Sequence, residues 1–195
     1  MHLSNRLLAV LSAAGTLAAG ACASAPMTST AAGTLATAGA EAMFFDASNA
    51  ASASASNQYE IRTSQLAVER AQNTGVKDYA RRMIEHHTTL EQKQTALLQQ
   101  KGVAPVDNAH SLQVKRNVPP TLQMLQQHQG MAFDVMYLVD QIGQHKNTLL
   151  TIDTSLLPTT RDPELQAMLR NEVRPLVVQH LDEATRLHQQ MLRGS

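Results

Sequence analysis

The sequence predicts an all-α protein, a four-helix bundle, from three observations. Aromatic residues are scarce, with three Tyr, three Phe and no Trp among 195 residues, whereas β-strands are rich in aromatic and β-branched side chains. Proline is absent between Pro26 and Pro105 and between Pro120 and Pro158, so long helices can run without a break. Apolar residues in these stretches recur at spacings of three and four, which is the helical period.

Residues 1–21 have the pattern of an export signal. Arg6 provides a positive charge, and residues 7–19 form an uncharged apolar run shorter than the roughly 20 residues that span a bilayer. The small residues before Cys22 resemble a bacterial lipoprotein signal, in which the Cys is lipidated. Ordinary cleavage beside Cys22 is the alternative. We therefore expect an exported, periplasmic protein, anchored to the outer membrane by lipid if Cys22 is modified.

Residues 22–42 are predicted to form a flexible linker. They consist mostly of Ala, Thr, Ser and Gly, contain a single acid, Glu41, and show no apolar periodicity. Such a stretch buries too little surface to offset the entropy lost on ordering. Residues 43–192 are left for the helical domain.

Helix-breaking residues separate the four predicted helices, which span residues 43–73, 76–101, 119–155 and 163–192. Gly102 follows the second helix, where a glycine commonly ends a helix. The pair Pro119-Pro120 suits the first turn of the third helix. Asp162 is a suitable N-cap for the fourth, with Pro163 at its first position. Short links within each pair of helices and one long connection, residues 103–118, are typical of a four-helix bundle.

Each predicted helix places an ionisable side chain on its inner face; these residues are Glu60, His87, His145 and His180. Burying such groups is costly unless they pair or bind a cation. Imidazole and carboxylate are ligands for Zn, Cu, Fe or Ni. A metal-free hydrogen-bond network from Glu60 to the histidines would satisfy the same atoms, so both interpretations remain open. Of the adjacent pair His86 and His87, only one can point inward.

Three segments resemble a known family: Thr74–His87, Phe133–Tyr137 followed by His145, and Arg170–His180. In these segments the chain is similar to the exported bacterial family catalogued as domain of unknown function 4142. The resemblance covers about residues 44–192 and implies a ferritin-like bundle. It also implies an acid in the first helix and one His in each of the others, at Glu60, His87, His145 and His180. The family usually carries Asp where this chain has His86, and it has no settled biochemical activity.

Other functional classes find little support in the sequence. The balance of 16 basic and 16 acidic residues removes the electrostatic argument for binding nucleic acid. There is no glycine-rich phosphate loop, no HExxH motif and no Glu-x-x-His pair of the kind that di-iron bundles use. No catalytic constellation stands out, which favours binding over catalysis.

We therefore expect an exported bundle that holds one Zn, Cu or Fe ion on Glu60, His87, His145 and His180. The alternative is a non-catalytic envelope module in which the same residues form a metal-free network and the outer surface serves a protein partner. The sequence does not identify that partner.

Overall fold

The computed structural model describes residues 30–194, and within this range the chain is helical with no strand. The predicted all-α class is therefore confirmed. The first four helices are α1 (Thr30–Arg70), α2 (Thr74–Lys101), α3 (Ala109–Gln126) and α4 (Gly130–Thr151). Helix α4 continues through a π-helical turn, η1 (Ile152–Leu156), into the short α5 (Leu157–Thr159). The last helical segment comprises α6 (Pro163–Met168), the π-helical turn η2 (Leu169–Val173) and α7 (Arg174–Gly194).

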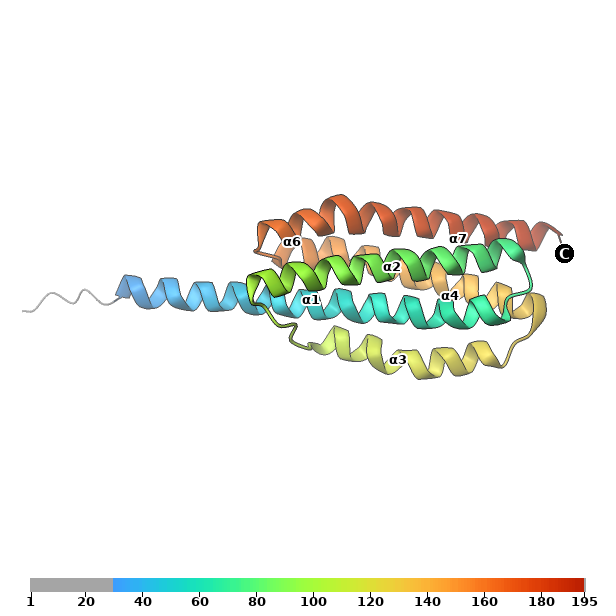
Figure 1. Ribbon diagram of the computed structural model, residues 1–195, viewed down its shortest axis with the longest axis horizontal. Helices are drawn as coiled ribbons and strands as arrows, with labels where there is room; N and C mark the ends of the chain where they lie inside the picture. Colours follow the sequence, from blue (N-terminus) through green and yellow to red (C-terminus); the bar gives the residue numbers. More distant parts are fainter. Residues whose placement is uncertain (1–29, 195) are drawn as a thin grey trace, which may run out of the picture.

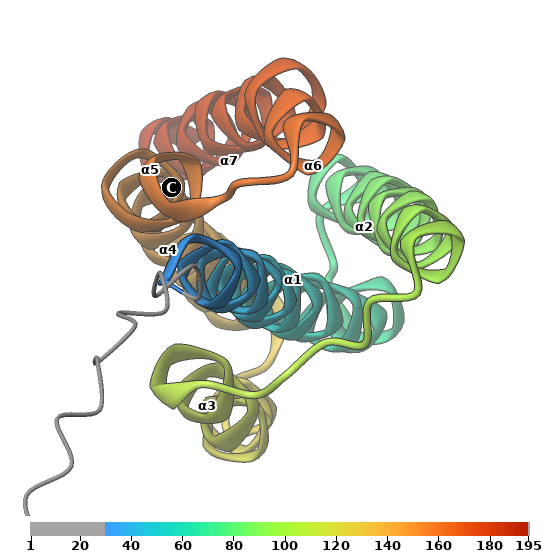
Figure 2. The same cartoon turned by 90° about the vertical axis from the view of Figure 1, so that its left-hand side faces the viewer.

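The long helices lie side by side and alternate in direction along the chain (Figure 1). Helix α1 packs against α2 and α3, and α4 packs against α7. Viewed along their length, α1, α2, α4 and α7 surround the interior, and α3 lies on the outer side of α1 (Figure 2). The N-terminal part of α1 extends beyond the other helices. Within residues 30–194, no helix combines the length and the apolar character needed to cross a bilayer.

Two helix boundaries follow the signals in the sequence. Gly102 ends α2 in the left-handed conformation, with φ of 65°. At the other end of the chain, Oδ1 of Asp162 accepts hydrogen bonds from the backbone N–H groups of Glu164 and Leu165, each at 3.0 Å. Pro163 occupies the first position of α6. These local contacts explain why the end of the second helix and the start of the last one are predicted correctly.

The prediction that residues 103–118 form a connection is wrong, because α3 already begins at Ala109. Helix α3 begins early because Asn108 and Ser111 form a capping box. The side chain of each residue accepts a hydrogen bond from the backbone N–H of the other, at 2.8 and 2.9 Å. Pro119 and Pro120 consequently lie inside α3 rather than in its first turn. The capping box is a stronger start signal here than the proline pair.

The predicted third helix, residues 119–155, is also wrong, because the chain reverses direction before Gly130 (Figure 1). Gly130 has φ of 60°, a left-handed conformation that glycine adopts readily. One turn into α4, the carboxylate of Asp134 accepts hydrogen bonds from the backbone N–H groups of Gln72 and Asn73, at 2.8 to 3.2 Å. This contact holds the start of α4 against the link between α1 and α2. Helix α4 therefore joins the bundle, and α3 becomes a fifth long helix on its outside.

Residues 30–42, which the sequence assigns to the linker, form the first turns of α1. Their many alanines explain this, because Ala has the highest helix propensity. Helix α1 meets the rest of the bundle at Asp46, whose carboxylate accepts hydrogen bonds from the backbone N–H groups of Arg161 and Asp162 at 2.7 and 2.9 Å. The predicted signal sequence and Cys22 lie outside the described residues.

Three clusters of buried apolar side chains fill the interior of the described chain, and two of them flank the middle of the bundle. The first contains Leu138 of α4 and Ala184 of α7. The second contains Ile152 of η1 and Val177 of α7. His145 of α4 lies between Leu138 and Ile152, and His180 of α7 lies between Val177 and Ala184. The candidate site therefore occupies the middle of the bundle, between these two clusters.

Candidate metal centre

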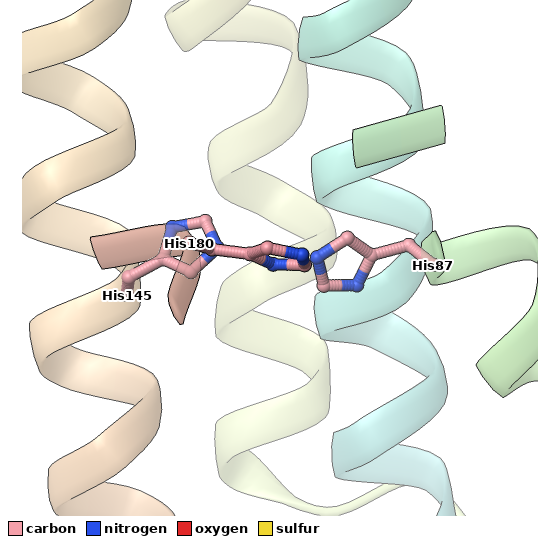
Figure 3. A group of neighbouring side chains, drawn as sticks. All are labelled: His87, His145 and His180. Carbon is pink, nitrogen blue, oxygen red and sulfur yellow. The ribbon is translucent and has the colours of Figure 1, made fainter. Parts of the chain in front are cut away.

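Three histidines from three helices meet in the middle of the bundle: His87 of α2, His145 of α4 and His180 of α7 (Figure 3). One ring nitrogen of each lies within 4.8 Å of the others. All three side chains are buried, with exposed fractions of 4%, 1% and 1%. In Figure 3 the ring of His180 lies between those of His145 and His87. The structure thus brings together the three histidines that helical periodicity places on inner faces.

The ring of His87 is held by a side-chain amide. Its Nδ1 lies 3.0 Å from Oδ1 of Asn57, and Nδ2 of Asn57 donates to Oε2 of Glu91 at 3.0 Å. Because the bond to Glu91 fixes the orientation of the amide, Asn57 presents an acceptor, and Nδ1 of His87 carries the proton. Nε2 of His87 then has a free lone pair. This buried atom has no hydrogen-bond partner among residues 30–194.

The ring of His145 is held by the backbone. Its Nδ1 lies 2.8 Å from the carbonyl oxygen of Gln141, one turn earlier in α4. A carbonyl oxygen can only accept, so Nδ1 carries the proton and Nε2 has the lone pair. Nε2 lies 3.3 Å from Nδ1 of His180. His145 and His87 therefore each contribute an unprotonated nitrogen to the cluster.

A fourth histidine, His86, contacts the cluster from its edge. Its Nδ1 lies 2.9 Å from Nε2 of His180, and the side chain is only partly buried. As expected for adjacent residues of a helix, His86 does not share the inward direction of His87; it reaches α7 from the side of α2. Helical spacing does not reveal this contact, because it depends on where α7 lies. Because Nε2 of His145 has only a lone pair, Nδ1 of His180 donates in the 3.3 Å contact between them, and Nε2 of His180 accepts from Nδ1 of His86. An ion bound at Nδ1 of His180 would move that proton to Nε2 and make His86 its acceptor.

Glu60, the predicted fourth ligand, lies beside the histidines. Its carboxylate oxygens do not belong to the group formed by the ring nitrogens of His87, His145 and His180. Its Oε1 is 3.8 Å from Nδ1 of His145, the ring nitrogen that binds Gln141 rather than the one that faces His180. Burial raises the pKa of Glu60 to about 8. Within the described chain, its Oε2 has no hydrogen-bond partner. Glu60 is therefore a buried carboxyl group with one oxygen available, next to His145.

A partly buried carboxyl group nearby, Asp140, was missed by the sequence reasoning. Its Oδ1 accepts a hydrogen bond from the hydroxyl of Tyr59 at 2.7 Å. Burial, with a smaller contribution from the negative charge of Glu60, raises the pKa of Asp140 to about 7. Asp140 flanks the apolar face of α4 instead of lying on it, so periodicity does not mark it. Only its contact with Tyr59 of α1 shows that it belongs to the interior.

The three clustered rings are neutral at pH 7. Burial lowers the pKa of His87 to about 3, with a further contribution from the charges of the neighbouring histidines. Burial likewise lowers the pKa of His145 to about 4, and burial followed by repulsion from His87 lowers the pKa of His180. Metal ions bind neutral imidazole, so the cluster is in the protonation state that coordination requires.

A cavity of about 30 Å³ adjoins the cluster and is bordered by His87, His145 and Glu60. Small side chains of α1 line part of it, and apolar residues of the two π-helical turns, including Ile152 and Val173, line another part. A π-helical turn accommodates an extra residue in a helix and is frequent at functional sites. The histidine nitrogens thus lie next to free space.

Comparison with known proteins identifies a family. The family model of a domain of unknown function, DUF4142, matches residues 23–187. This range includes every residue of the candidate metal centre. No curated protein and no solved structure matches the chain.

Proposed function

Since the chain belongs to the DUF4142 family of domains of unknown function, we propose a function from its own site: it is an exported protein that binds a single transition-metal ion. The ligand atoms are Nε2 of His87, Nε2 of His145 and Nδ1 of His180. Zn, Cu and Fe are the candidate ions, because imidazole is a suitable ligand for all three.

One observation carries this proposal, namely the unpartnered Nε2 of His87. A buried polar atom without a partner destabilises a protein by about 1–3 kcal/mol. The hydrogen bond to Asn57 fixes the proton on Nδ1, so the lone pair on Nε2 cannot be replaced by moving the proton. Coordination of a cation would satisfy this lone pair together with those of the two neighbouring rings.

The contacts behind the rings support the same proposal. Metal-binding histidines usually donate their other N–H to a carbonyl, carboxylate or similar acceptor, which orients the ring and fixes the tautomer. Asn57 serves His87 in this way, and the carbonyl of Gln141 serves His145. His86 is placed to serve His180. Without an ion, Nδ1 of His180 donates to Nε2 of His145, so binding of the ion would require the proton of His180 to move to Nε2, where His86 can accept it.

Glu60 is proposed as the anionic partner of the ion. It borders the same cavity as His87 and His145, and its Oε2 is unpartnered. A nearby cation favours the ionised carboxylate and opposes the effect of burial on its pKa. The proposal therefore includes Glu60 with the three histidines, as the sequence predicts.

Export and lipid anchoring remain part of the proposal and rest on residues 1–22 of the sequence. A lipidated Cys22 would hold the domain at the outer membrane, because a diacylated residue buries far more CH₂ groups than a single chain. The substitution Cys22→Ala is then expected to move the protein from the membrane fraction to the soluble periplasm. Unchanged fractionation would contradict lipidation while leaving export intact.

The metal proposal is tested by thermal unfolding of untagged protein that has been stripped of metal. An ion that binds only the native state raises the melting temperature. Addition of one equivalent of Zn, Cu or Fe(II) is therefore expected to raise it, and chelator is expected to reverse the change. Metal analysis after desalting should give one ion per chain.

Two variants make this test specific. His145→Ala removes a ligand and should abolish the metal-dependent shift, whereas His188→Ala removes a histidine on the same helix as His180 and should retain it. The metal-free network makes the opposite prediction: neither metal nor chelator changes the melting temperature, and His145→Ala only destabilises. Absence of a shift with all three ions would reject metal binding.

A further inference from the structure

The cavity beside the histidines exists because small side chains line one of its sides. From residue 50 to 56, α1 consists only of Ala and Ser, whose side chains are too small to fill the space opposite the π-helical turns. A second cavity, of about 20 Å³, lies next to the first and shares Ala53, Gln94 and Val173 with it. The second cavity extends to Asp46 and Thr160, at the end of the bundle where α6 begins.

We propose that this cavity receives a neutral diatomic molecule, which binds the ion at a position that the protein leaves open. The proposal rests on the proposed metal site and adds the class of its external ligand.

The open position follows from the ligands and their surroundings. Non-haem iron sites with His and carboxylate ligands keep open positions beside the protein ligands. The cavity is bordered by His87 and His145 and not by His180. The free space next to the proposed ion therefore lies on the side of His87 and His145. Nε2 of His87, which has no hydrogen-bond partner in the described chain, is on this side.

The size and lining of the cavity select the ligand. A volume of about 30 Å³ holds only one or two water-sized groups, since a single water needs at least about 10–15 Å³ on this scale. Among the residues that line it, none is Lys or Arg, and Leu90, Ile152 and Val177 contribute apolar surface. Because Glu60 borders the cavity and neither Lys nor Arg does, a further anion is disfavoured, and a larger substrate would not fit. A neutral diatomic molecule meets both conditions.

The test uses the full mature chain loaded anaerobically with Fe(II), with nitric oxide as the probe. Binding is followed by electron paramagnetic resonance and visible absorption, and Fe(II) content is measured on the same samples. Val173→Phe is designed to fill the cavity, and Val178→Phe makes the same change on the outer side of α7, beside Arg82 and Pro175. Val173→Leu is a milder filling variant in case the Phe variant does not fold.

We expect nitric oxide to bind the wild type and Val178→Phe with equal affinity. Val173→Phe should bind it at least tenfold more weakly with unchanged Fe(II) content, and Val173→Leu should show a smaller loss. Nitric oxide that fails to bind Fe(II)-loaded protein, or that binds the filled variants as tightly as the wild type, overturns the inference and leaves the metal site standing. Failure to take up Fe(II), Zn or Cu rejects the metal site and the inference with it.

Discussion

Nδ1 of His86 lies 2.9 Å from Nε2 of His180, and the two rings are within 9° of parallel. His86 is only partly buried, whereas His180 is almost completely buried. The contact therefore links the edge of the bundle to its interior. In the proposed metal-bound state, an acceptor at this point holds the proton of His180 on Nε2 and leaves Nδ1 to the ion.

His86→Ala is therefore expected to weaken metal binding about 10- to 100-fold, the usual effect of removing an outer hydrogen-bond partner from a metal-bound His. His86→Asp should restore the acceptor and most of the affinity. Competition with a chelator of known affinity measures both variants, and His188→Ala is the control. If His86→Ala bound metal as tightly as the wild type, or if Asp gave no recovery, His86 would not position His180.

Because the chain turns at Gly130 before α4, we expect Gly→Ala substitutions at Gly130 and at Gly143 to have opposite effects on stability. Gly130 has φ of 60°, and an added Cβ would lie 3.2 Å from the side chain of Gln72. Gly130→Ala should therefore destabilise the protein by about 1–2 kcal/mol. Gly143 is an exposed position inside α4, where an added Cβ meets nothing within 4 Å, so Gly143→Ala should stabilise by about 0.5–1 kcal/mol. Urea unfolding measures both; stabilisation by both substitutions would indicate a continuous helix.

The buried carboxyl of Glu60 predicts a pH-dependent stability of the metal-free protein. Burial raises the pKa of Glu60 from 4.5 to about 8, so between these values the folded state retains a proton that the unfolded state releases. The stability that Glu60 contributes is present below pH 4.5 and is lost as the pH rises through about 8. Glu60→Gln cannot ionise. Its unfolding free energy should therefore increase relative to the wild type across this window.

Urea unfolding at several pH values, with chelator present, checks this expectation. Glu85→Gln removes a carboxyl group at an exposed position of α2 and controls for the loss of one surface charge. A difference between Glu60→Gln and the wild type that does not change with pH would show that Glu60 titrates normally in the folded protein.

The clustered histidines predict the opposite sign at acid pH. Burial lowers the pKa of His145 from 6.5 to about 4, so between these values the unfolded state binds a proton that the folded state does not. Stability is therefore lost as the pH falls from 6.5 toward 4. His145→Gln removes one of the responsible groups and should make the decline shallower in metal-free protein. Thermal unfolding across this range, with His188→Gln as the control, measures the slopes; equal slopes would contradict the prediction.

The sequence by itself determined those features that depend on neighbouring residues along one helix. The period of three and four placed His87, His145 and His180 on inner faces, because every residue of a helix has a direction set by its position. Gly102 ended α2, and Asp162 with Pro163 began α6, because each cap acts on backbone groups within a few residues. The capping box of Asn108 and Ser111 is equally local and could have been found in the same way.

Only the tertiary structure decided the features that join residues far apart in the chain. Asp134 holds α4 against the link between α1 and α2, and this contact divides the predicted third helix. His86 reaches His180 because of where α2 and α7 lie, and Glu60 lies beside Nδ1 of His145 because of where α1 and α4 lie. The spacing of residues along a helix gives the direction of a side chain but not the distance to the next helix. Packing sets that distance, and with it the ring contacts, the unpartnered nitrogen and the cavity.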